Sequence, residues 1–363
     1  MKPLKIAMIV SHLSPAYGLE AISLSTMQLL RSKYSVEMIC VGGSTRDLEV
    51  CRDALVLGSP LRDMGRLRTI WRLFKVRSKI DADVIILAGT WVALPWLLVA
   101  GKLAAKSVVW EHSLLKERFS VSSQMRLLAG AAAVLYSKAA AVVTVSEALG
   151  SYMRELLGHA NVLTIPNAVA KSKNLGGEFV RGSTKQTEYR LLNVGSLTPL
   201  KAQHLLIEAV SLLDDRFVLT IVGNGAELQR LRELATSLGV QSRVNFSGYL
   251  ESSELRKLYT DSDMMVHSAV AETFGLVYVE AAQAGLPVLS TRSSVSEEMI
   301  PGFVPGWICE PQATSIAESI VRHQDNPPSE DCKLEAESRR ESHFGPHAVL
   351  SKWSELLETL NSR

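Results

Sequence analysis

Short apolar, β-rich runs alternate with longer helix-forming segments along almost the whole chain, and this alternation constrains the fold most. In the first half, the runs lie at residues 6–10, 36–41, 84–87, 108–110, 141–145 and 162–165. A second series lies at residues 190–194, 218–222, 244–246, 264–267, 288–290 and 306–309. Strands separated by helical crossovers pair in parallel. The sequence therefore predicts an α/β protein with two Rossmann-like domains, each built on a parallel sheet.

A polar stretch rich in glycine separates the two series and predicts the domain boundary. With 363 residues the chain is long enough for two domains that each bury a core of their own. We expect an N-terminal domain over 1–170, a linker or hinge over 171–188 and a C-terminal domain over 189–335. The amphipathic tail over 336–363 predicts a closing helix.

Composition excludes several classes of protein. Apolar residues make up 47% and charged residues 21%, as in a folded globular protein, and a net charge of +2 gives no argument for nucleic acid. A lysine, Lys138, lies deep in the apolar run over 127–145, which we therefore interpret as a buried helix and strand rather than a membrane span.

We expect a cytoplasmic location, because the N-terminal apolar run is too short for a secretory signal. The scattered cysteines favour a reducing compartment and no structural zinc: Cys40, Cys51, Cys309 and Cys332.

The segment over 271–290 says most about function. Glu272 and Glu280 stand eight positions apart, and between them Gly275 is expected to open a helix. Two acids near a helix start are common without any ligand. The first helical turn also presents free backbone N–H groups that favour phosphate, and a glutamate can accept hydrogen bonds from paired ribose hydroxyls. A nucleotide sugar is the simplest ligand with a diphosphate between a ribose and a second polyol.

The loop after the predicted strand at 190–194 supplies a candidate cation. Gly195 lets the backbone approach a ligand closely, and Lys201 can reach a phosphate as a point charge. A lone exposed lysine is more often simply solvated. The nearby Gly223-Asn224-Gly225 lacks the third glycine of a dinucleotide fingerprint, so we interpret it as a tight strand-to-helix turn.

Two Asp-x-Asp pairs, at 81–83 and 261–263, raise the question of a metal site. Both pairs stand immediately before a predicted strand, whereas ligands of open parallel sheets bind outside the carboxyl ends of the strands. We therefore interpret these acids as helix-to-strand turns, and we expect neither a bound metal nor another cofactor.

The glutamate pair and its surroundings resemble family 4 of the retaining glycosyltransferases, which have the GT-B fold. The resemblance rests on two glutamates separated by seven residues. Phe-Gly-Leu-Val follows shortly after the first glutamate, and Glu-Ala-x-x-x-Gly-x-Pro-Val begins at the second. The resemblance covers nearly the whole chain. It implies a hexosyltransferase that moves a sugar from a nucleotide-diphosphate sugar, UDP rather than GDP, to a hydroxyl of a lipid-linked or cell-surface glycan precursor, with retention. It also implies a role in polysaccharide synthesis, such as that of lipopolysaccharide or exopolysaccharide, and a C-terminal helix that returns to the first domain.

The resemblance also implies roles for individual residues. Glu272 would orient the sugar, Lys201 would neutralise the leaving diphosphate, and His112 would line the acceptor side as the third catalytic candidate. Gly18 would belong to a glycine-rich loop on the acceptor side. The remaining candidates would bind the donor: Gly195, Ser196, Phe274, Gly275, Leu276, Val277 and Glu280.

The sequence departs from the family pattern in the loop that carries Lys201. The family typically has Gly-Arg-Leu followed by Lys-Gly, but here Ser196 replaces the arginine and Ala202 the second glycine. One guanidinium for the diphosphate is therefore missing, which bears on donor affinity more than on reaction class. A same-fold nucleotide-sugar epimerase, a phosphorylase-like enzyme and a non-catalytic nucleotide-sugar-binding partner remain as alternatives.

The segment over 61–80 has seven basic residues against the lone Asp63, interleaved with apolar side chains that include Trp71 and Phe74. This pattern fits a basic amphipathic helix on the anionic inner face of a membrane. It fits an ordinary crossover helix with a solvated face equally well. No recognised reading module accompanies the basic patch, and we expect no nucleic-acid partner.

Overall fold

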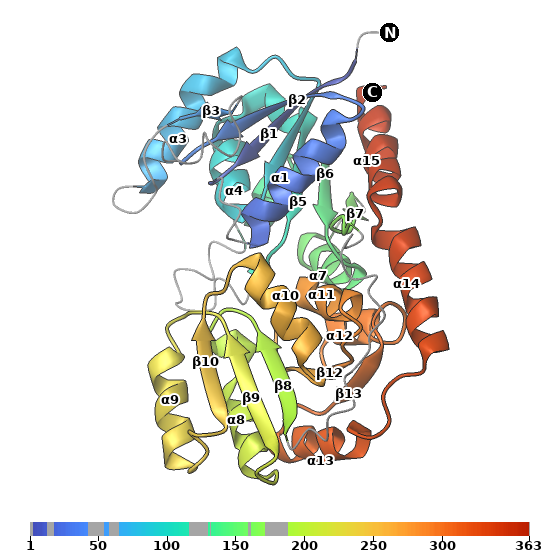
Figure 1. The fold of residues 1–363 in the computed structure, drawn as a ribbon. Coiled ribbons are helices and arrows are strands. Elements are labelled where there is room, and N and C mark those ends of the chain that lie inside the picture. Colours follow the sequence, from blue (N-terminus) through green and yellow to red (C-terminus); the bar gives the residue numbers. More distant parts are fainter. Residues whose placement is uncertain are drawn as a thin grey trace. The chain divides into compact units, whose positions relative to one another are not determined.

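The computed structural model describes residues 3–12, 18–42, 54–57, 65–115, 130, 132–158, 161–170 and 188–362. Two parallel sheets flanked by helices make up these parts (Figure 1). The chain divides into two compact units, the first made of 1–170 with 343–363 and the second of 171–342. The α/β class with two parallel sheets is confirmed. The predicted linker over 171–188 lies outside the described residues except for Glu188.

The sheet of the first unit has the strand order β3-β2-β1-β4-β5-β6-β7, and every described pair is parallel. Every residue of β4 and β5 is buried, as expected for parallel strands whose two faces are both covered. The strand bounds are β1 Lys5–Val10, β2 Ser35–Cys40, β3 Leu55–Val56, β4 Val84–Ala88, β5 Ser107–Glu111, β6 Ala141–Thr144 and β7 Val162–Thr164.

The helices of the first unit include the last helix of the chain, α15, which packs against α1 and β4. Helix α7 shows why such segments begin and end where they do. The Ser146 hydroxyl accepts a hydrogen bond from the Leu149 amide at 3.1 Å, and Gly158 ends the helix in the left-handed region at φ 63°. The helix bounds are α1 Gly18–Arg31, α3 Gly65–Val76, η1 Arg77–Lys79, α4 Thr90–Val99, η2 Gly101–Lys106, α7 Glu147–Leu157 and α15 Pro346–Asn361.

The sheet of the second unit has the order β10-β9-β8-β11-β12-β13, also parallel, with an apolar core between its strands and α8, α9 and α13. Its strands are β8 Tyr189–Val194, β9 Phe217–Val222, β10 Val244–Gly248, β11 Met264–His267, β12 Val288–Thr291 and β13 Gly306–Cys309. Its helices are η3 Pro199–Lys201, α8 His204–Ser211, α9 Leu228–Ser237, α10 Ser252–Asp261, α11 Leu276–Gln283, α12 Ser294–Met299 and α13 Ala313–His323.

The tail forms two helices where the sequence led us to expect one. Helix α14 spans Glu330–Phe344, and α15 begins at Pro346. Gly345 between them has an extended backbone, with φ −59° and ψ 147°. A proline disfavours helical geometry in the residue before it, which explains the break. No helix in the described parts of the chain combines the length and apolar character that a membrane crossing needs.

The strand order reverses at one point in each sheet, between β1 and β4 in the first unit and between β8 and β11 in the second. Ligands of open α/β sheets bind at such a switch point, outside the carboxyl ends of the strands. The topology therefore predicts a ligand site at the loops that follow β8 and β11 in the second unit. In the first unit it predicts one at the segments after β1, β4 and β5.

The Asp-x-Asp pairs lie at the other ends of the strands. The Asp83 carboxylate accepts a hydrogen bond from the backbone N–H of Lys5 at 2.9 Å, and Asp263 accepts one from Arg190 at 2.8 Å. In each unit, the second aspartate of the pair directly precedes a strand at the switch point, β4 or β11. It ties the start of that strand to the neighbouring strand, β1 or β8. This shared contact supports the interpretation of these acids as structural turns.

Candidate functional site

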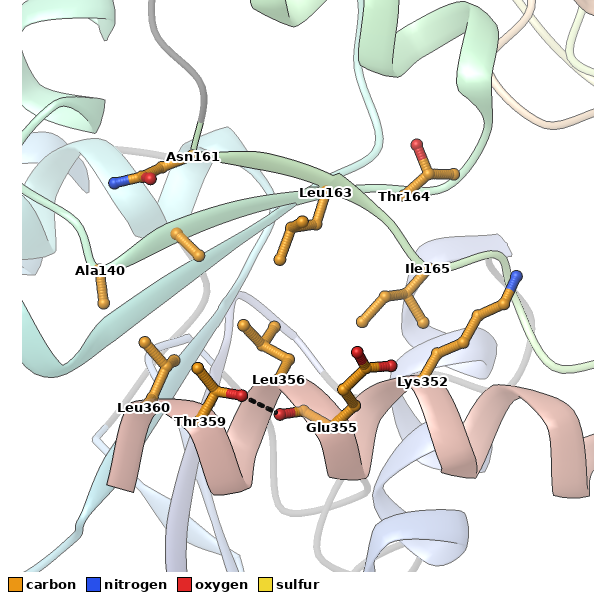
Figure 2. Close-up of a pocket in the computed structure, with 11 residues that line it drawn as sticks. Ala140, Asn161, Leu163, Thr164, Ile165, Lys352, Glu355, Leu356, Thr359 and Leu360 are labelled. Atoms are coloured by element: carbon orange, nitrogen blue, oxygen red, sulfur yellow. Dashed lines mark hydrogen bonds between the residues drawn. The ribbon is translucent and has the colours of Figure 1, made fainter. Parts of the chain in front are cut away.

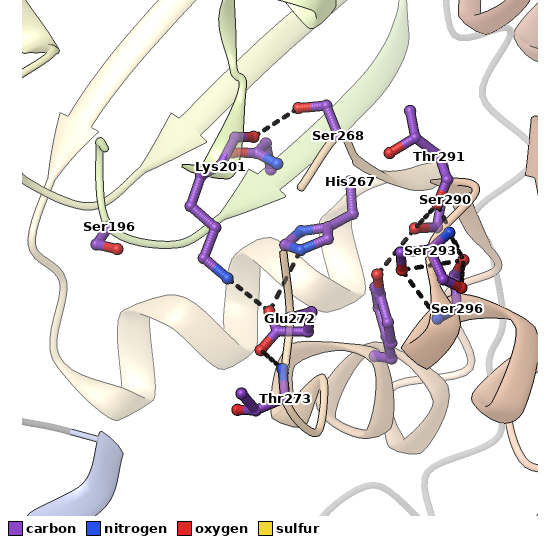
Figure 3. Close-up of polar contacts among 12 residues, drawn as sticks. Ser196, Lys201, His267, Ser268, Glu272, Thr273, Ser290, Thr291, Ser293 and Ser296 are labelled. Carbon is purple, nitrogen blue, oxygen red and sulfur yellow. Dashed lines mark hydrogen bonds and ion pairs between the residues drawn. The ribbon is translucent and has the colours of Figure 1, made fainter. Parts of the chain in front are cut away.

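An ion pair between Lys201 and Glu272 spans the switch point of the second sheet (Figure 3). Lys201 follows β8 and Glu272 follows β11, and the Lys201 Nζ lies 2.5 Å from the Glu272 Oε2. Only 19% of the lysine side chain and 15% of the glutamate side chain are exposed. The structure therefore joins two of the three candidate catalytic residues where the topology predicts a ligand.

Backbone and side-chain contacts hold the two loops together. The Ser268 hydroxyl donates to the Lys201 carbonyl at 2.9 Å, and the Val270 amide donates to the Leu200 carbonyl at 3.0 Å. Ala202 follows Lys201 with φ 47°, the left-handed region that favours glycine. This strained position is the one where the resembled family has a glycine.

The charge of Glu272 is stabilised inside the site. Burial raises the pKa of this carboxyl, but the Lys201 ammonium and the His267 ring together lower it by more, so the net shift is downward. The other carboxylate oxygen accepts a hydrogen bond from the Thr273 amide at 2.9 Å. Glu272 is therefore ionised at neutral pH.

His267, the last residue of β11, is a member of this site that the sequence analysis did not single out. Its Nε2 lies 3.6 Å from the Glu272 Oε2, beyond hydrogen-bond distance, and its ring packs edge-on against Tyr278. Burial lowers the pKa of His267, and the nearby Lys201 charge adds to this against an opposing contribution from Glu272. The only sequence signal was its place at the carboxyl end of a strand beside the switch point.

The start of α11 lies just after Glu272. Gly275 precedes the helix with φ 74°, and Phe274 is buried. Leu276 and Val277 form the half-buried first turn, where helix geometry leaves the amides without an acceptor in the helix. A Cβ added at Gly275 would lie 2.4 Å from the ring of Tyr278. Glycine is needed here for both the backbone angle and the space.

We expect Gly275→Ala to lower the free energy of unfolding by about 2 kcal/mol, because it combines left-handed strain with a ring clash. Gly239→Ala is the matched control, since Gly239 has φ 72° with no atom within 4 Å of an added Cβ. The control should cost about 1 kcal/mol. Urea unfolding measures both, and equal losses would contradict a steric role for the Tyr278 ring.

The carboxylate of Glu280 accepts a hydrogen bond from another residue that was not predicted from the sequence. The Tyr259 hydroxyl, from α10, donates to the Glu280 Oε2 at 2.9 Å. Burial raises the pKa of Glu280, and the hydrogen bond from Tyr259 opposes this. The second oxygen and the remaining lone pairs can still accept hydrogen bonds from a ligand.

Gly195 and Ser196, the two candidate residues in the loop after β8, have different surroundings. A Cβ added at Gly195 would have only the Lys201 Cε within 4 Å, at 4.0 Å, so the backbone here is open toward the lysine. Ser196 is exposed, and its carbonyl accepts a hydrogen bond from the Gln203 side chain at 3.0 Å. Figure 3 shows Ser196 apart from the Lys201–Glu272 pair. Ser196 therefore does not take the place of the family's arginine beside the Lys201–Glu272 pair.

In the first unit, the residue beside His112 proves to be the centre of a polar cluster. Glu111 ends β5 and is completely buried. Its carboxylate accepts hydrogen bonds from the Thr90 hydroxyl at 2.9 Å and the Tyr136 hydroxyl at 2.5 Å. It also accepts them from the amides of His112 at 2.9 Å and Ser113 at 2.8 Å. Burial raises the pKa of Glu111, and these donors oppose the increase.

The contacts around Glu111 fix the backbone that carries His112. The His112 ring packs edge-on against Trp110 at 4.4 Å, and its buried Nε2 has no hydrogen-bond partner among the described residues. Burial lowers the pKa of His112 to about 3, so the imidazole is neutral at pH 7. Gly18, the other acceptor-side candidate, is the first residue of α1 after β1.

A separate pocket of about 440 Å³ lies in the first unit between β6, β7 and α15 (Figure 2). Leu163, Leu356 and Leu360 give it an apolar part, and Asn161 and Lys352 lie at its margin. None of the predicted site residues lines it. We therefore attribute it to the packing of the C-terminal helix at the sheet edge. In the described ranges, no group of three or more His, Cys, Asp or Glu side chains is arranged to hold a metal ion.

Two family models match the chain, one in each half. A glycosyl transferase 4-like domain matches residues 18–168, and the glycosyl transferases group 1 model matches residues 178–339. An uncharacterized glycosyltransferase of Haemophilus influenzae is 23% identical over 97% of this chain and 99% of that protein. A lipopolysaccharide core biosynthesis glycosyltransferase of Rhizobium meliloti is 38% identical, but over only 28% of this chain and 29% of that protein.

Solved structures share the fold along the whole chain. The crystal structure of Anabaena HepE in complex with UDP and glucose has a TM-score of 0.79 and 20% identity, with 98% of this chain and 100% of that chain covered. WaaG, a glycosyltransferase involved in lipopolysaccharide biosynthesis, has a TM-score of 0.72 and 16% identity, with 97% and 99% covered. With both halves matched by glycosyltransferase models and the fold shared throughout, the chain belongs to the family 4, group 1 glycosyltransferases and is an enzyme with the GT-B fold.

Proposed function

We propose that this glycosyltransferase moves a hexose from a nucleotide-diphosphate sugar to a hydroxyl of a lipid-linked or cell-surface glycan precursor. The observation that carries the proposal is the Lys201–Glu272 pair beside the start of α11, at the switch point of the second sheet. A cation, free helix amides and an ionised carboxylate lie there within one site. A diphosphate attached to a polyol would use all three.

In the proposed reaction the acceptor oxygen forms a bond to the anomeric carbon of the sugar while the bond between that carbon and the diphosphate breaks. Negative charge develops on the departing diphosphate, which takes up the proton of the acceptor hydroxyl. The Lys201 ammonium and the amides at Leu276 and Val277 stabilise that charge. Glu272 accepts hydrogen bonds from the hydroxyls of the sugar and orients it. Glu280 accepts them from the ribose, with Tyr259 holding its carboxylate. Retention of anomeric configuration follows the family pattern.

We assign acceptor contacts to the first unit, through His112 and the segment at Gly18. Because burial keeps the His112 imidazole neutral, a hydrogen bond between its Nε2 and the incoming hydroxyl would add no positive charge to the acceptor side. Glu111 acts on this residue only through the backbone that it fixes.

We propose that the nucleotide of the donor sugar contains uridine rather than guanosine. Support comes from Anabaena HepE, a protein of the same fold whose structures contain UDP and UDP-glucose. The lipopolysaccharide relatives support a glycan precursor as acceptor. We also propose a cytoplasmic reaction that needs no metal or other cofactor, so a chelator should leave the rate unchanged.

Glu280→Ala should weaken nucleotide binding by about 1.5–3 kcal/mol, the usual cost of a lost hydrogen bond to a charged group. Calorimetry with UDP measures this change. Glu298→Ala, on α12 of the same unit, is the control and should bind as the parent does. Equal affinity for the parent and Glu280→Ala would remove Glu280 from the ribose site.

The proposal is tested first with a thermal-shift panel of uridine, guanosine and adenosine diphosphates, where UDP should raise Tm most. Product analysis by NMR with the matching sugar donor then separates the alternatives. A donor converted without any acceptor would indicate an epimerase. A sugar phosphate formed only with inorganic phosphate would indicate a phosphorylase-like enzyme. Binding with no turnover on any glycan acceptor would favour a non-catalytic partner.

A further inference from the structure

Two packed helices of the first unit expose a row of large apolar side chains. On α3, Trp71 is 56% exposed and Phe74 is 49% exposed. On α4, which packs against α3, Trp91 and Leu98 are 40% and 59% exposed. Leu94 and Pro95 lie between Trp91 and Leu98 at helical spacing and are half-buried, so one whole face of α4 is apolar. Such a cluster on a protein surface marks an interaction site.

Basic side chains lie on the same helices or on the short helices that follow them, and we call the apolar cluster together with these side chains the α3–α4 surface. They come from α3, η1 and η2, and within the described residues none of them pairs with Asp or Glu: Arg68, Arg72, Lys75, Arg77, Lys79, Lys102 and Lys106. The only acids between residues 65 and 106 are Asp81 and Asp83, and both contact Lys5 of β1. The positive charge of the surface is therefore not neutralised by its own acids.

The aromatic rings and the cations are arranged as a unit. The Lys75 ammonium lies 3.8 Å from the centroid of the Trp71 ring, and the Arg77 guanidinium lies 4.1 Å from that of Phe74. Arg77 also donates to the Val99 carbonyl and so ties η1 to the end of α4. Both exposed rings of α3, Trp71 and Phe74, are thus held next to a charge that attracts anions.

We propose that the α3–α4 surface docks on the anionic face of a lipid bilayer. Aromatic and leucine side chains enter the boundary between headgroups and acyl chains, and the surrounding lysines and arginines contact the lipid phosphates. The two-helix surface adds the apolar face of α4 to the basic helix seen in the sequence. A solvated crossover helix does not require exposed tryptophan, phenylalanine and leucine beside one another. Contact of this kind is peripheral and reversible.

The proposal goes beyond the reaction itself and does not depend on the donor site, which lies in the second unit. If the acceptor is lipid-linked, docking would bring the enzyme to the membrane that holds it. The two proposals can fail separately, because UDP binding reports on the second unit and vesicle binding reports on the first.

The test is co-sedimentation of the full chain with vesicles of phosphatidylcholine alone or with about 30% phosphatidylglycerol. We expect at least tenfold stronger partitioning to the anionic vesicles, and loss of that preference at high salt. The double variants Trp71→Ser/Phe74→Ser and Lys75→Glu/Lys79→Glu should each lower partitioning about tenfold or more. All four side chains are exposed, so circular dichroism and the UDP-induced shift in Tm should match the parent.

A matched control is Arg256→Glu/Lys257→Glu, which reverses two exposed charges on α10 of the second unit and should bind vesicles as the parent does. Equal partitioning to both vesicle types would overturn the proposal. So would an unchanged affinity of both double variants of the α3–α4 surface. Binding of a random-sequence oligonucleotide, lost in the same variants, without vesicle binding would assign the surface to nucleic acid instead.

Discussion

Replacing Lys201 with alanine is expected to lower turnover by about 10²-fold or more, the usual loss when one preorganised partner of a developing anion is removed. Lys201 is the cation paired with Glu272 at the switch point, and the family pattern's arginine is replaced by Ser196. In the proposed reaction, the departing diphosphate would therefore depend more on this ammonium than it would in a site with two cations. Steady-state kinetics at saturating donor measure the effect on kcat.

The alanine variant also leaves the Glu272 carboxylate half-buried without its cation, which destabilises the fold. The fraction folded, from circular dichroism, must therefore accompany each rate. Lys201→Arg restores the charge and should recover part of the rate, because a guanidinium can contact phosphate in a different geometry. Lys257→Ala, an exposed lysine on α10, is the control for loss of a charge. A folded Lys201→Ala enzyme with the parental rate would exclude the lysine from the reaction.

Glu111→Ala should lower the free energy of unfolding by about 3–5 kcal/mol. The change leaves the hydroxyls of Thr90 and Tyr136, and the amides of His112 and Ser113, without their common acceptor in the interior. Each buried group that loses its partner retains the cost of having left water. Urea unfolding followed by tryptophan fluorescence measures the loss.

Glu111→Gln separates the hydrogen bonds from the charge. The amide oxygen can still accept two or three of the bonds, so we expect a smaller loss than with alanine. Glu155→Ala, an exposed acid on α7, should change the stability by less than about 0.5 kcal/mol. A loss as small for Glu111→Ala as for this control would show that the cluster does not stabilise the first unit.

The sequence predicted the two parallel sheets because β-rich runs separated by helices have few other ways to pack. It also singled out Glu272 and Lys201 from their places after two strands. It did not reveal Tyr259 or Glu111, since a tyrosine in an amphipathic helix and a glutamate at a strand end have no distinctive local pattern. Their importance comes from partners 21 and 25 residues away in the chain.

The tail shows a further limit of local patterns. Its amphipathic spacing indicated one helix, whereas Pro346 divides it into α14 and α15. A proline at the first helical position and a proline that ends a helix look alike in the sequence. Which of these applies depends on whether Gly345 is extended or helical.

By itself, the sequence determined the fold class, the family and the loops that carry the candidate site, because periodicity and short motifs depend on neighbours along the chain. Only the tertiary structure joined Lys201 to Glu272, 71 positions apart, and exposed the apolar faces of α3 and α4 beside cations that pair with no Asp or Glu among the described residues. Strand order and helix packing decide such contacts. They follow from the burial of many side chains at once, which no single segment encodes.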